Sequence, residues 1–525
     1  MRCPLITFFI LQAAFHFPVE GRSQHENATE IPDKPLRIEI PARSSSETYR
    51  TIPCGPEGLI LFFRSQEVVD ALHVNWYFSF YDTNMQQVWV KSIPLLNEQD
   101  LIFTQPGTDT LGLFFVASGK SRSADHEFEL LRIVIRNGTF ILNKGTLPAN
   151  AEVASFAIRQ DRAWLGINIK GQAGTIRNIR LKQGLEKSFS LGQGNLISVR
   201  WMKPDSTSET VTAVVGRQIS KKDHEYYLVR YDTTGIIKTE ILIGALTGGR
   251  ELKQMDVISS QPGEYLLLGI YGDGTGTTTS KSRSAGESTG FFACSITNKT
   301  QKSIQFYNYL ELQHANSLLG EQDIMNLKKK ALKKNKSLSE YSLDVPVLLQ
   351  GISRFKEQYI IAAEIFSPQY HSENFTDFDY YGRPYTNSYS VFDGYRFANA
   401  IVAGFNLEGK LIWDNTLEIR NIISHELASK VVVFQSGDDH VLCYISDGKI
   451  GSKIITENRV VEKLDFAAID LMYPGDKLIS ESRGRLVPWY ANYFLSSGYH
   501  EIKNISLESN NKRLVFYFSK LRFEK

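Results

Sequence analysis

Alternation of apolar and polar residues is the clearest pattern in this chain of 525 residues. In the stretch 226–243, two runs rich in β-branched and aromatic residues flank Asp232, Thr233, Thr234 and Gly235. Aspartate can hydrogen-bond to its own backbone and glycine accepts positive φ, so these four residues are typical of a tight turn. The stretch therefore predicts a β-hairpin.

The same hairpin recurs along the chain. Apolar runs that precede hairpins begin at residues 59, 111, 163, 212 and 264, which are 52, 52, 49 and 52 residues apart, and two more begin at 358 and 440. The predicted turns lie at residues 82–84, 136–138, 182–184, 232–235, 298–299, 407–409 and 457–458. The hairpins after Asp82, Asp232 and Asn406 are the most alike.

A unit of about fifty residues with roughly four short strands is typical of a β-propeller blade. A lone four-stranded sheet cannot bury both faces, whereas radially arranged sheets pack on their neighbours. The seven hairpins predict an all-β fold, a seven-bladed β-propeller over residues 25–525, with eight blades as the second choice. The runs 36–40 and 513–518 are expected to help close the ring. A set of β-sandwich domains is the alternative, but the chain lacks the polar linkers expected between domains.

Insertions interrupt this repeat at residues 271–290, 314–342 and 366–397, and repeat scaffolds commonly carry function on inserted loops. The first is rich in Gly, Ser and Thr and includes Ser288 in the pattern G-x-S-x-G. A nucleophile elbow requires a preceding strand and a following helix. Here a loop precedes Ser288 and a strand-like run follows, so no catalytic serine is predicted.

The second insertion predicts one inserted helix, because Ile324, Leu327 and Ala331 are spaced at i, i+3 and i+7. Lysines crowd its C-terminal half, and the predicted secondary basic surface consists of Lys328, Lys329, Lys330, Lys333 and Lys334. Such a surface suits an acidic partner or a membrane headgroup surface. The alternative is a solvated helix laid on the propeller.

The third insertion is dense in aromatic residues, which are enriched at binding hot spots. The predicted partner-binding residues are Tyr370, Phe375, Phe378, Tyr380, Tyr381, Arg383, Tyr385, Tyr389, Phe392 and Tyr395. Two alternatives stay open: the insertion could pack on its own blade, or its rings could stack on sugars. Asp377 and Asp379 lack the Gly and distal Glu of an EF-hand loop, so no calcium site is predicted.

Charge and motifs narrow the function further. Lys and Arg number 59 against 57 Asp and Glu, so the chain lacks the basic footprint of a nucleic-acid-binding protein. Neither H-E-x-x-H nor a Cys/His metal set occurs, and no catalytic residue, metal or cofactor is predicted. This favours a binding protein over an enzyme, although residues from different blades could still assemble a catalytic site in space.

The N-terminus predicts export. Residues 1–24 read as a signal peptide, with Arg2 before an apolar run, 5–17, that is too short to span a membrane. No later stretch approaches the length of a transmembrane helix. Cys54, Cys294 and Cys443 suggest no disulfide framework, and the last two are expected to be small buried hydrophobes. Export with so few cysteines indicates a bacterial cell envelope, periplasmic or outer-membrane-associated, with extracellular release as the other possibility.

Two hairpins carry a family resemblance. Residues 80–89 and 405–413, which end in Trp89 and Trp413, resemble repeats of quinoprotein-type (PQQ-like) propellers, in which a strand, an Asp/Asn-Gly turn and a Trp recur in every blade. The other five hairpins lack the Trp, and no quinone is predicted. Envelope proteins of this appearance include non-enzymatic scaffolds of outer-membrane assembly and secretion machines. The predicted function is therefore a non-catalytic interaction module that binds an outer-membrane or secretion-channel protein; the alternative is a polysaccharide-binding or polysaccharide-degrading propeller.

Overall fold

The computed structural model describes residues 36–523, with gaps at 46, 119–120, 122, 193–196, 206–208, 221–222, 245–248, 262, 274–286, 315–324, 327–328, 330–331, 334–343, 379 and 505–511. Leu36–Lys525 is a compact unit by itself. The predicted signal peptide lies outside the described residues. Within these residues no helix is long and apolar enough to cross a membrane.

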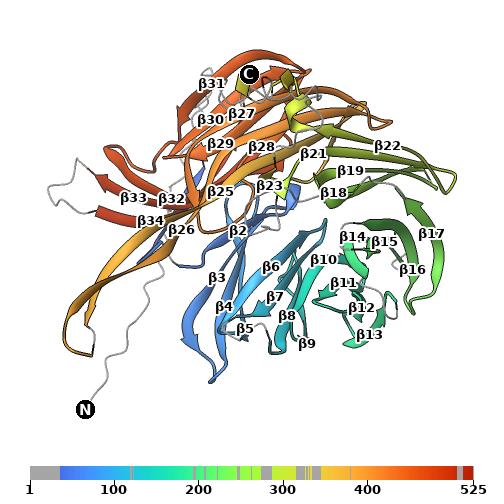
Figure 1. Ribbon diagram of the computed structural model, residues 1–525. Coiled ribbons are helices and arrows are strands. Elements are labelled where there is room, and N and C mark those ends of the chain that lie inside the picture. The colour runs from blue at the N-terminus through green and yellow to red at the C-terminus, as the bar shows by residue number, and fades with distance from the viewer. Residues whose placement is uncertain are drawn as a thin grey trace, which may run out of the picture. The chain divides into compact units, whose positions relative to one another are not determined.

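The described residues form eight antiparallel sheets (Figure 1). The first four sheets contain β2 (Arg50–Pro53), β3 (Leu59–Val68), β4 (His73–Tyr81) and β5 (Gln87–Leu96); β6 (Gln99–Pro106), β7 (Thr110–Ala117), β8 (His126–Val134) and β9 (Phe140–Leu147); β10 (Ala151–Arg159), β11 (Arg162–Ile169), β12 (Thr175–Arg180) and β13 (Leu185–Ser190); and β14 (Ile197–Pro204), β15 (Thr210–Gln218), β16 (His224–Asp232) and β17 (Ile237–Ile243). In each of them the strands pair in sequence order.

The fifth, sixth and seventh sheets continue the series. They contain β18 (Arg250–Gln261), β19 (Glu264–Asp273), β21 (Gly290–Thr297) and β22 (Thr300–Asn308); β20 (Glu287–Ser288), β23 (Val345–Leu349), β24 (Ser353–Phe355), β25 (Gln358–Phe378), β26 (Pro384–Asn406) and β27 (Leu411–Ser424); and β28 (Val432–Ser436), β29 (Asp439–Ser446), β30 (Lys449–Thr456) and β31 (Arg459–Ala468). The sixth sheet is the exception in size, with six strands.

The eighth sheet joins the two ends of the described chain. It contains β32 (Asp476–Tyr490), β33 (Tyr493–Asn504), β34 (Lys512–Arg522) and β1 (Arg37–Pro41), which pairs with β34 in the register Ile38↔Phe518. The two terminal runs predicted to close the fold therefore pair with each other. The seven units that the sequence predicts as first choice are one fewer than the eight sheets observed. The eighth sheet was not counted because β32–β34 are completed by β1, from the other end of the described chain.

Sheet-on-sheet packing accounts for the core. Each of eight hydrophobic clusters combines buried side chains from two sheets that follow one another in the chain, and one of them combines the eighth sheet with the first. In that cluster Leu59 and Tyr81 of the first sheet meet Trp489 and Phe518 of the eighth. Every sheet thus buries both of its faces, which a lone four-stranded sheet cannot do. This all-β arrangement is consistent with a propeller.

The turns that looked alike in sequence share one hydrogen-bonding pattern. The Asp232 carboxylate accepts hydrogen bonds from the backbone N–H groups of Thr234 (2.8 Å) and Ile236 (3.0 Å). Asp82 and Asn406 accept from the residues two and four positions on in the same way. The residue three positions on has positive φ in each turn: Met85 (63°), Gly235 (88°) and Gly409 (84°). The side-chain oxygen thus fixes the turn whether or not glycine follows.

The three predicted insertions have different outcomes. Most of the first insertion, residues 274–286, lies outside the described residues, and its next described element is β20. Most of the predicted lysine-rich helix also lies outside them; Lys329 and Lys333 are described and exposed, whereas Lys328, Lys330 and Lys334 are not described. The helical elements with bounds are the short 3-10 turns η1 (Gly55–Glu57) and η2 (Tyr309–Glu311). The third insertion is fully extended and continues the strands β25 and β26.

Candidate functional site

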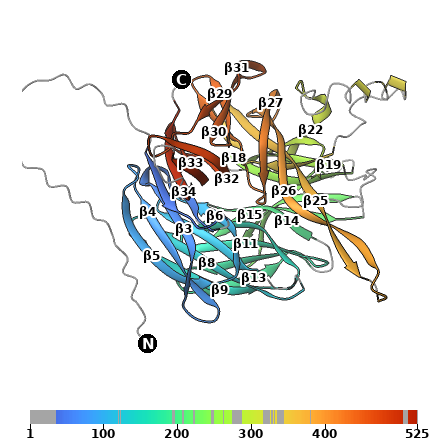
Figure 2. The same ribbon diagram turned by 90° about the vertical axis from the view of Figure 1, so that its left-hand side faces the viewer.

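The predicted aromatic insertion is a long two-stranded hairpin that extends beyond the strands beside it (orange in Figures 1 and 2). We call residues 366–397 the projecting hairpin. Its strands pair from Phe366↔Phe397 to Phe378↔Pro384, whereas β27 pairs only as far as Tyr395. Phe366 and Phe397 are buried at its base. From Tyr370 to the turn, no third strand pairs with it within the described residues.

Its predicted binding residues reach solvent. Tyr380 is 98% exposed, Tyr381 79% and Phe378 63%. The rest of the predicted set is exposed as well, except Tyr395, which is half-buried. The alternative that this insertion folds back onto its own sheet therefore holds only for its base.

Cross-strand pairing groups these rings on two faces and a tip. On one face the rings of Tyr370 and Phe392 lie 5.5 Å apart, and Phe392 lies 5.0 Å from Tyr395. On the other face the ring of Phe375 lies 5.8 Å from that of Tyr389. At the tip, Tyr380 and Tyr381 are 5.6 Å apart, and the Arg383 guanidinium lies 5.8 Å from the Tyr381 ring. The ribbon thus presents aromatic contact surface on both sides.

Charged groups accompany the second face. The Tyr389 hydroxyl donates to Glu373, and the Tyr385 hydroxyl donates to Asp377 (3.1 Å). His371 bonds to Asp393 through Nδ1 and to Glu373 through Nε2. These carboxylates favour the imidazolium form, so they raise the pKa of His371 above its usual value, with Asp393 the larger cause.

A second region was not predicted from the sequence. A cavity of about 900 Å³ lies where five sheets converge, lined from β2, β3, β6, β26, β27, β29 and β32 and by the connection 424–430. We call it the arginine cavity after Arg50, Arg483 and Arg485, which all line it. Apolar side chains such as Ile52, Phe62 and Leu101 form other parts of the wall.

The connection 424–430 is fixed in place at both ends of its span. The fully buried Glu364 carboxylate accepts hydrogen bonds from the backbone N–H groups of Lys430 (2.9 Å) and Val431 (3.0 Å) and from the Gln350 amide. Burial raises the pKa of Glu364 despite these donors. On the cavity wall, Arg50 Nη2 lies 2.8 Å from Glu426 Oε1. This ion pair joins the first sheet to the connection between the sixth and seventh sheets.

Arg483 lies in an irregular stretch of β32. The pairing of β32 with β33 shifts between Ser482 and Arg485, and Arg483 has a φ of 53°. Asn421, also on the cavity wall, has a φ of 57°. Non-glycine residues adopt such angles at a cost, and they concentrate at functional sites. The bulge places two arginines, separated by Gly484, on one cavity wall.

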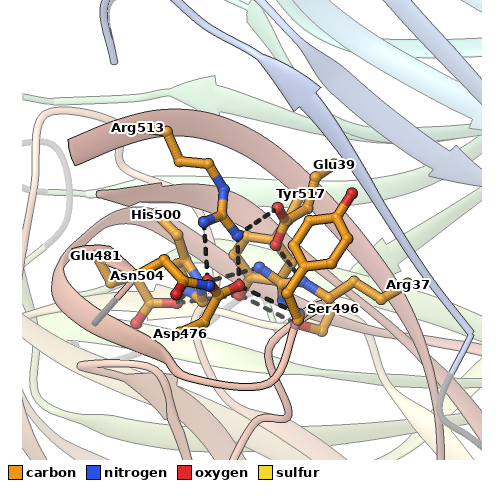
Figure 3. Close-up of polar contacts among 10 residues, drawn as sticks. Arg37, Glu39, Asp476, Glu481, Ser496, His500, Asn504, Arg513 and Tyr517 are labelled. Atoms are coloured by element: carbon orange, nitrogen blue, oxygen red, sulfur yellow. Dashed lines mark hydrogen bonds and ion pairs between the residues drawn. The ribbon is translucent and has the colours of Figure 1, made fainter. Parts of the chain in front are cut away.

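A buried polar network supports this wall from behind (Figure 3). Glu481 of β32 lines the cavity, and its Oε1 accepts from the Tyr517 hydroxyl (3.0 Å) and lies 3.2 Å from His500 Nε2. His500 Nδ1 lies 3.2 Å from Arg37 Nη2, and the Arg37 guanidinium stacks 4.2 Å from the Tyr517 ring. Burial lowers the pKa of His500, and Glu481 opposes that shift. The network holds β1, β32, β33 and β34 in register beneath the cavity.

The remaining candidates have structural explanations. Ser288 is fully buried, and its hydroxyl contacts the backbone oxygens of Tyr271 and Gly290 and the Tyr309 hydroxyl, so it is no exposed nucleophile. Cys294 and Cys443 are buried, as predicted, and burial raises the pKa of each thiol to about 12. Among the described residues no group of three or more His, Cys, Asp or Glu is placed to hold a metal ion.

Sequence reasoning missed the arginine cavity because its residues come from distant parts of the chain. Arg50 and Arg483 are more than 400 positions apart, and nothing in the spacing of either points to the other. The one local signal was Arg-Gly-Arg at 483–485, two cations flanking a glycine inside an otherwise alternating strand. Glycine inside a strand pattern suggests a bulge, and that reading would have marked the position.

Comparisons with known proteins find similarity to solved structures alone. No family model matches the chain, and a search of curated proteins also finds no match. Among solved structures it is similar to the polysaccharide lyase Uly1 (9% identity, TM-score 0.37, 93% of this chain and 99% of that one). It is also similar to a neuraminidase-like protein from A/bat/Guatemala/164/2009, with 9% identity and a TM-score of 0.32 over 91% of this chain and 94% of that one. A third similar structure is the WD40 domain of SCAP from fission yeast, with 10% identity and a TM-score of 0.32 over 78% of this chain and 82% of that one. These comparisons assign the chain to no family.

Proposed function

We propose that this chain is a non-catalytic β-propeller module of the bacterial cell envelope, with its eight sheets as blades, and that a protein partner binds the projecting hairpin. The partner is an outer-membrane or secretion-channel component. The observation that carries the proposal is the exposure of the predicted aromatic residues along an ordered ribbon. Burying such rings against a partner is favourable, and tyrosine contributes large contact area at low entropy cost.

The ribbon offers two kinds of contact. Beyond Tyr370 its outer strand edges pair with no further strand within the described residues, so a partner strand could add to either edge. The rings at the tip, Tyr380 and Tyr381, would fill pockets of that partner. Arg383 beside Tyr381 adds a cation at the same end. Main-chain pairing would supply affinity and the tip would supply specificity.

The test is capture from solubilised envelope, followed by binding of the purified partner. The variant Tyr380→Ser/Tyr381→Ser is compared with Phe140→Ser, which removes an exposed ring from β9 on another sheet. We expect the double variant to weaken binding at least tenfold, as for loss of a hot spot, and the control to bind as the original chain does. Equal binding by all three would overturn the proposed role of the hairpin.

A further inference from the structure

We propose that the arginine cavity binds the oxyanionic group, carboxylate or phosphate, of a small ligand, held by Arg485 together with Arg50 and Arg483. Among its lining residues this site shares only Asp393 with the projecting hairpin, and the proposal does not depend on the proposed function. The volume of about 900 Å³ is within the range of small-molecule sites. Its walls are richer in charged and polar groups than in apolar side chains, which suits a charged ligand.

The main observation is that the Arg485 guanidinium forms no hydrogen bond within the described residues, although Glu426 lies close enough to act on its charge. No hydrogen bond or ion pair to Arg485 is found within the described part of the chain, although its side chain reaches solvent inside the cavity. Burial lowers the pKa of Arg485, as does the nearby Arg50, and Glu426 opposes both; a guanidinium nevertheless stays protonated in proteins. A fixed cation in that setting is stabilised by an anion that enters from solvent.

The acidic residues of the cavity are mostly engaged elsewhere. Asp393 bonds to His371, and the Glu481 side chain is directed into the buried network behind the wall. Glu426 is the acid that faces the arginines, and its carboxylate contacts Arg50 while remaining half exposed. Asp447, in an exposed turn, is the remaining acid on the wall. The Glu426 carboxylate therefore pairs with Arg50 and would compete with an incoming oxyanion for that arginine.

The shape of the arginine group also suits an oxyanion. A guanidinium presents a planar fork of N–H donors that matches carboxylate and phosphate oxygens. Arg483 donates to the backbone oxygen of Glu47 (3.2 Å) through Nη1, which orients its side chain. Ile102, Ile423 and Leu427 also line the cavity and have exposed side chains, so the body of the ligand would have apolar surface to contact. An acidic sugar and a phosphorylated small molecule both meet this description.

The experiment is calorimetric titration of the full chain with sodium galacturonate, inorganic phosphate and neutral galactose at constant ionic strength. We expect at least one of the two anions to bind saturably and galactose not to bind. Binding of galacturonate alone identifies a carboxylate ligand, and binding of phosphate alone identifies a phosphorylated one. Failure of both anions to saturate, or equal binding of galactose, overturns the proposal.

Three variants locate the site. Arg485→Gln should weaken binding roughly tenfold or more, because charge-assisted hydrogen bonds are lost. Glu426→Gln removes the internal competitor and should strengthen binding by roughly threefold, and it serves if Arg485→Gln fails to fold. Arg420→Gln, an exposed arginine paired with Glu418 and absent from the cavity wall, should bind as the original chain does. Unchanged affinity in both Arg485→Gln and Glu426→Gln, or weaker binding in Glu426→Gln, contradicts the assignment.

Discussion

The projecting hairpin and the arginine cavity are built in opposite ways. The hairpin gathers its aromatic residues from two strands that follow each other in sequence, and it leaves them in solvent. The cavity gathers Arg50 from the first sheet, Arg483 and Arg485 from the eighth and Glu426 from a connection, and its wall rests on buried carboxylates and a buried histidine. The difference separates a surface that local sequence specifies from a site that only the complete fold can assemble. It also predicts that charged groups near the cavity carry stability, whereas those on the hairpin do not.

The largest expected effect is on stability, from the carboxylate that anchors the cavity wall. Glu364→Ala removes the acceptor for the backbone N–H groups of Lys430 and Val431 in a fully buried position. We expect it to lower the free energy of unfolding by about 3 kcal/mol, since buried donors left without a partner are costly. Denaturant unfolding measures this change.

The matched change on the hairpin is Glu373→Ala, which also removes a carboxylate that accepts two side-chain hydrogen bonds. Because Glu373 is fully exposed, we expect its removal to change the free energy of unfolding far less than Glu364→Ala does. Equal losses in Glu364→Ala and Glu373→Ala would break the contrast between the two regions.

The second effect is a pH dependence that comes from His500. Its burial lowers its pKa in the folded chain below the unfolded value of about 6.5, so the unfolded state binds more protons as pH falls. The stability that neutral His500 contributes is therefore complete above the unfolded pKa and is lost as pH falls through the folded pKa. Within that window we expect a loss of up to about 1.4 kcal/mol per pH unit.

Unfolding measured from pH 7 to pH 5 in the original chain and in His500→Gln tests this effect. Glutamine does not titrate, so the variant should show a flatter profile over that interval. The groups around His500 are Glu481, Arg37, Glu39 and Tyr517, and all stay in place in the comparison. Parallel profiles would show that His500 is not the group responsible.

Sequence reasoning reached the all-β class, the recurring hairpins and the aromatic stretch, because each depends on short-range pattern. The turns after Asp82, Asp232 and Asn406 are an example, since one side-chain oxygen fixes each of them. It did not reach the number of sheets, since β1 completes a sheet begun more than 400 residues later. It missed the cavity for the same physical reason: register and packing between sheets decide which side chains meet.

The third effect concerns association and leaves stability unchanged. Because Tyr380, Tyr381 and Phe378 are exposed on an unpaired ribbon, they should promote self-association at high protein concentration. Replacing all three with serine should lower the association constant measured by sedimentation several-fold. The free energy of unfolding should change by no more than about 0.5 kcal/mol. A large loss of stability would instead mean that the tip packs on the body of the fold.

The smallest expected effect is the titration of His371 at the base of the hairpin. Asp393 and Glu373 raise the pKa of His371 above its usual value, the opposite direction to His500. Nuclear magnetic resonance of the two imidazoles should therefore place His371 above 6.5 and His500 below it. Asp393→Asn should lower the His371 pKa, because it removes the larger cause, and should leave that of His500 unchanged. Asp393 bonds to His371 and also lines the cavity. A shift of the His371 pKa when the anion is added would therefore show that the projecting hairpin and the arginine cavity are coupled through this one carboxylate.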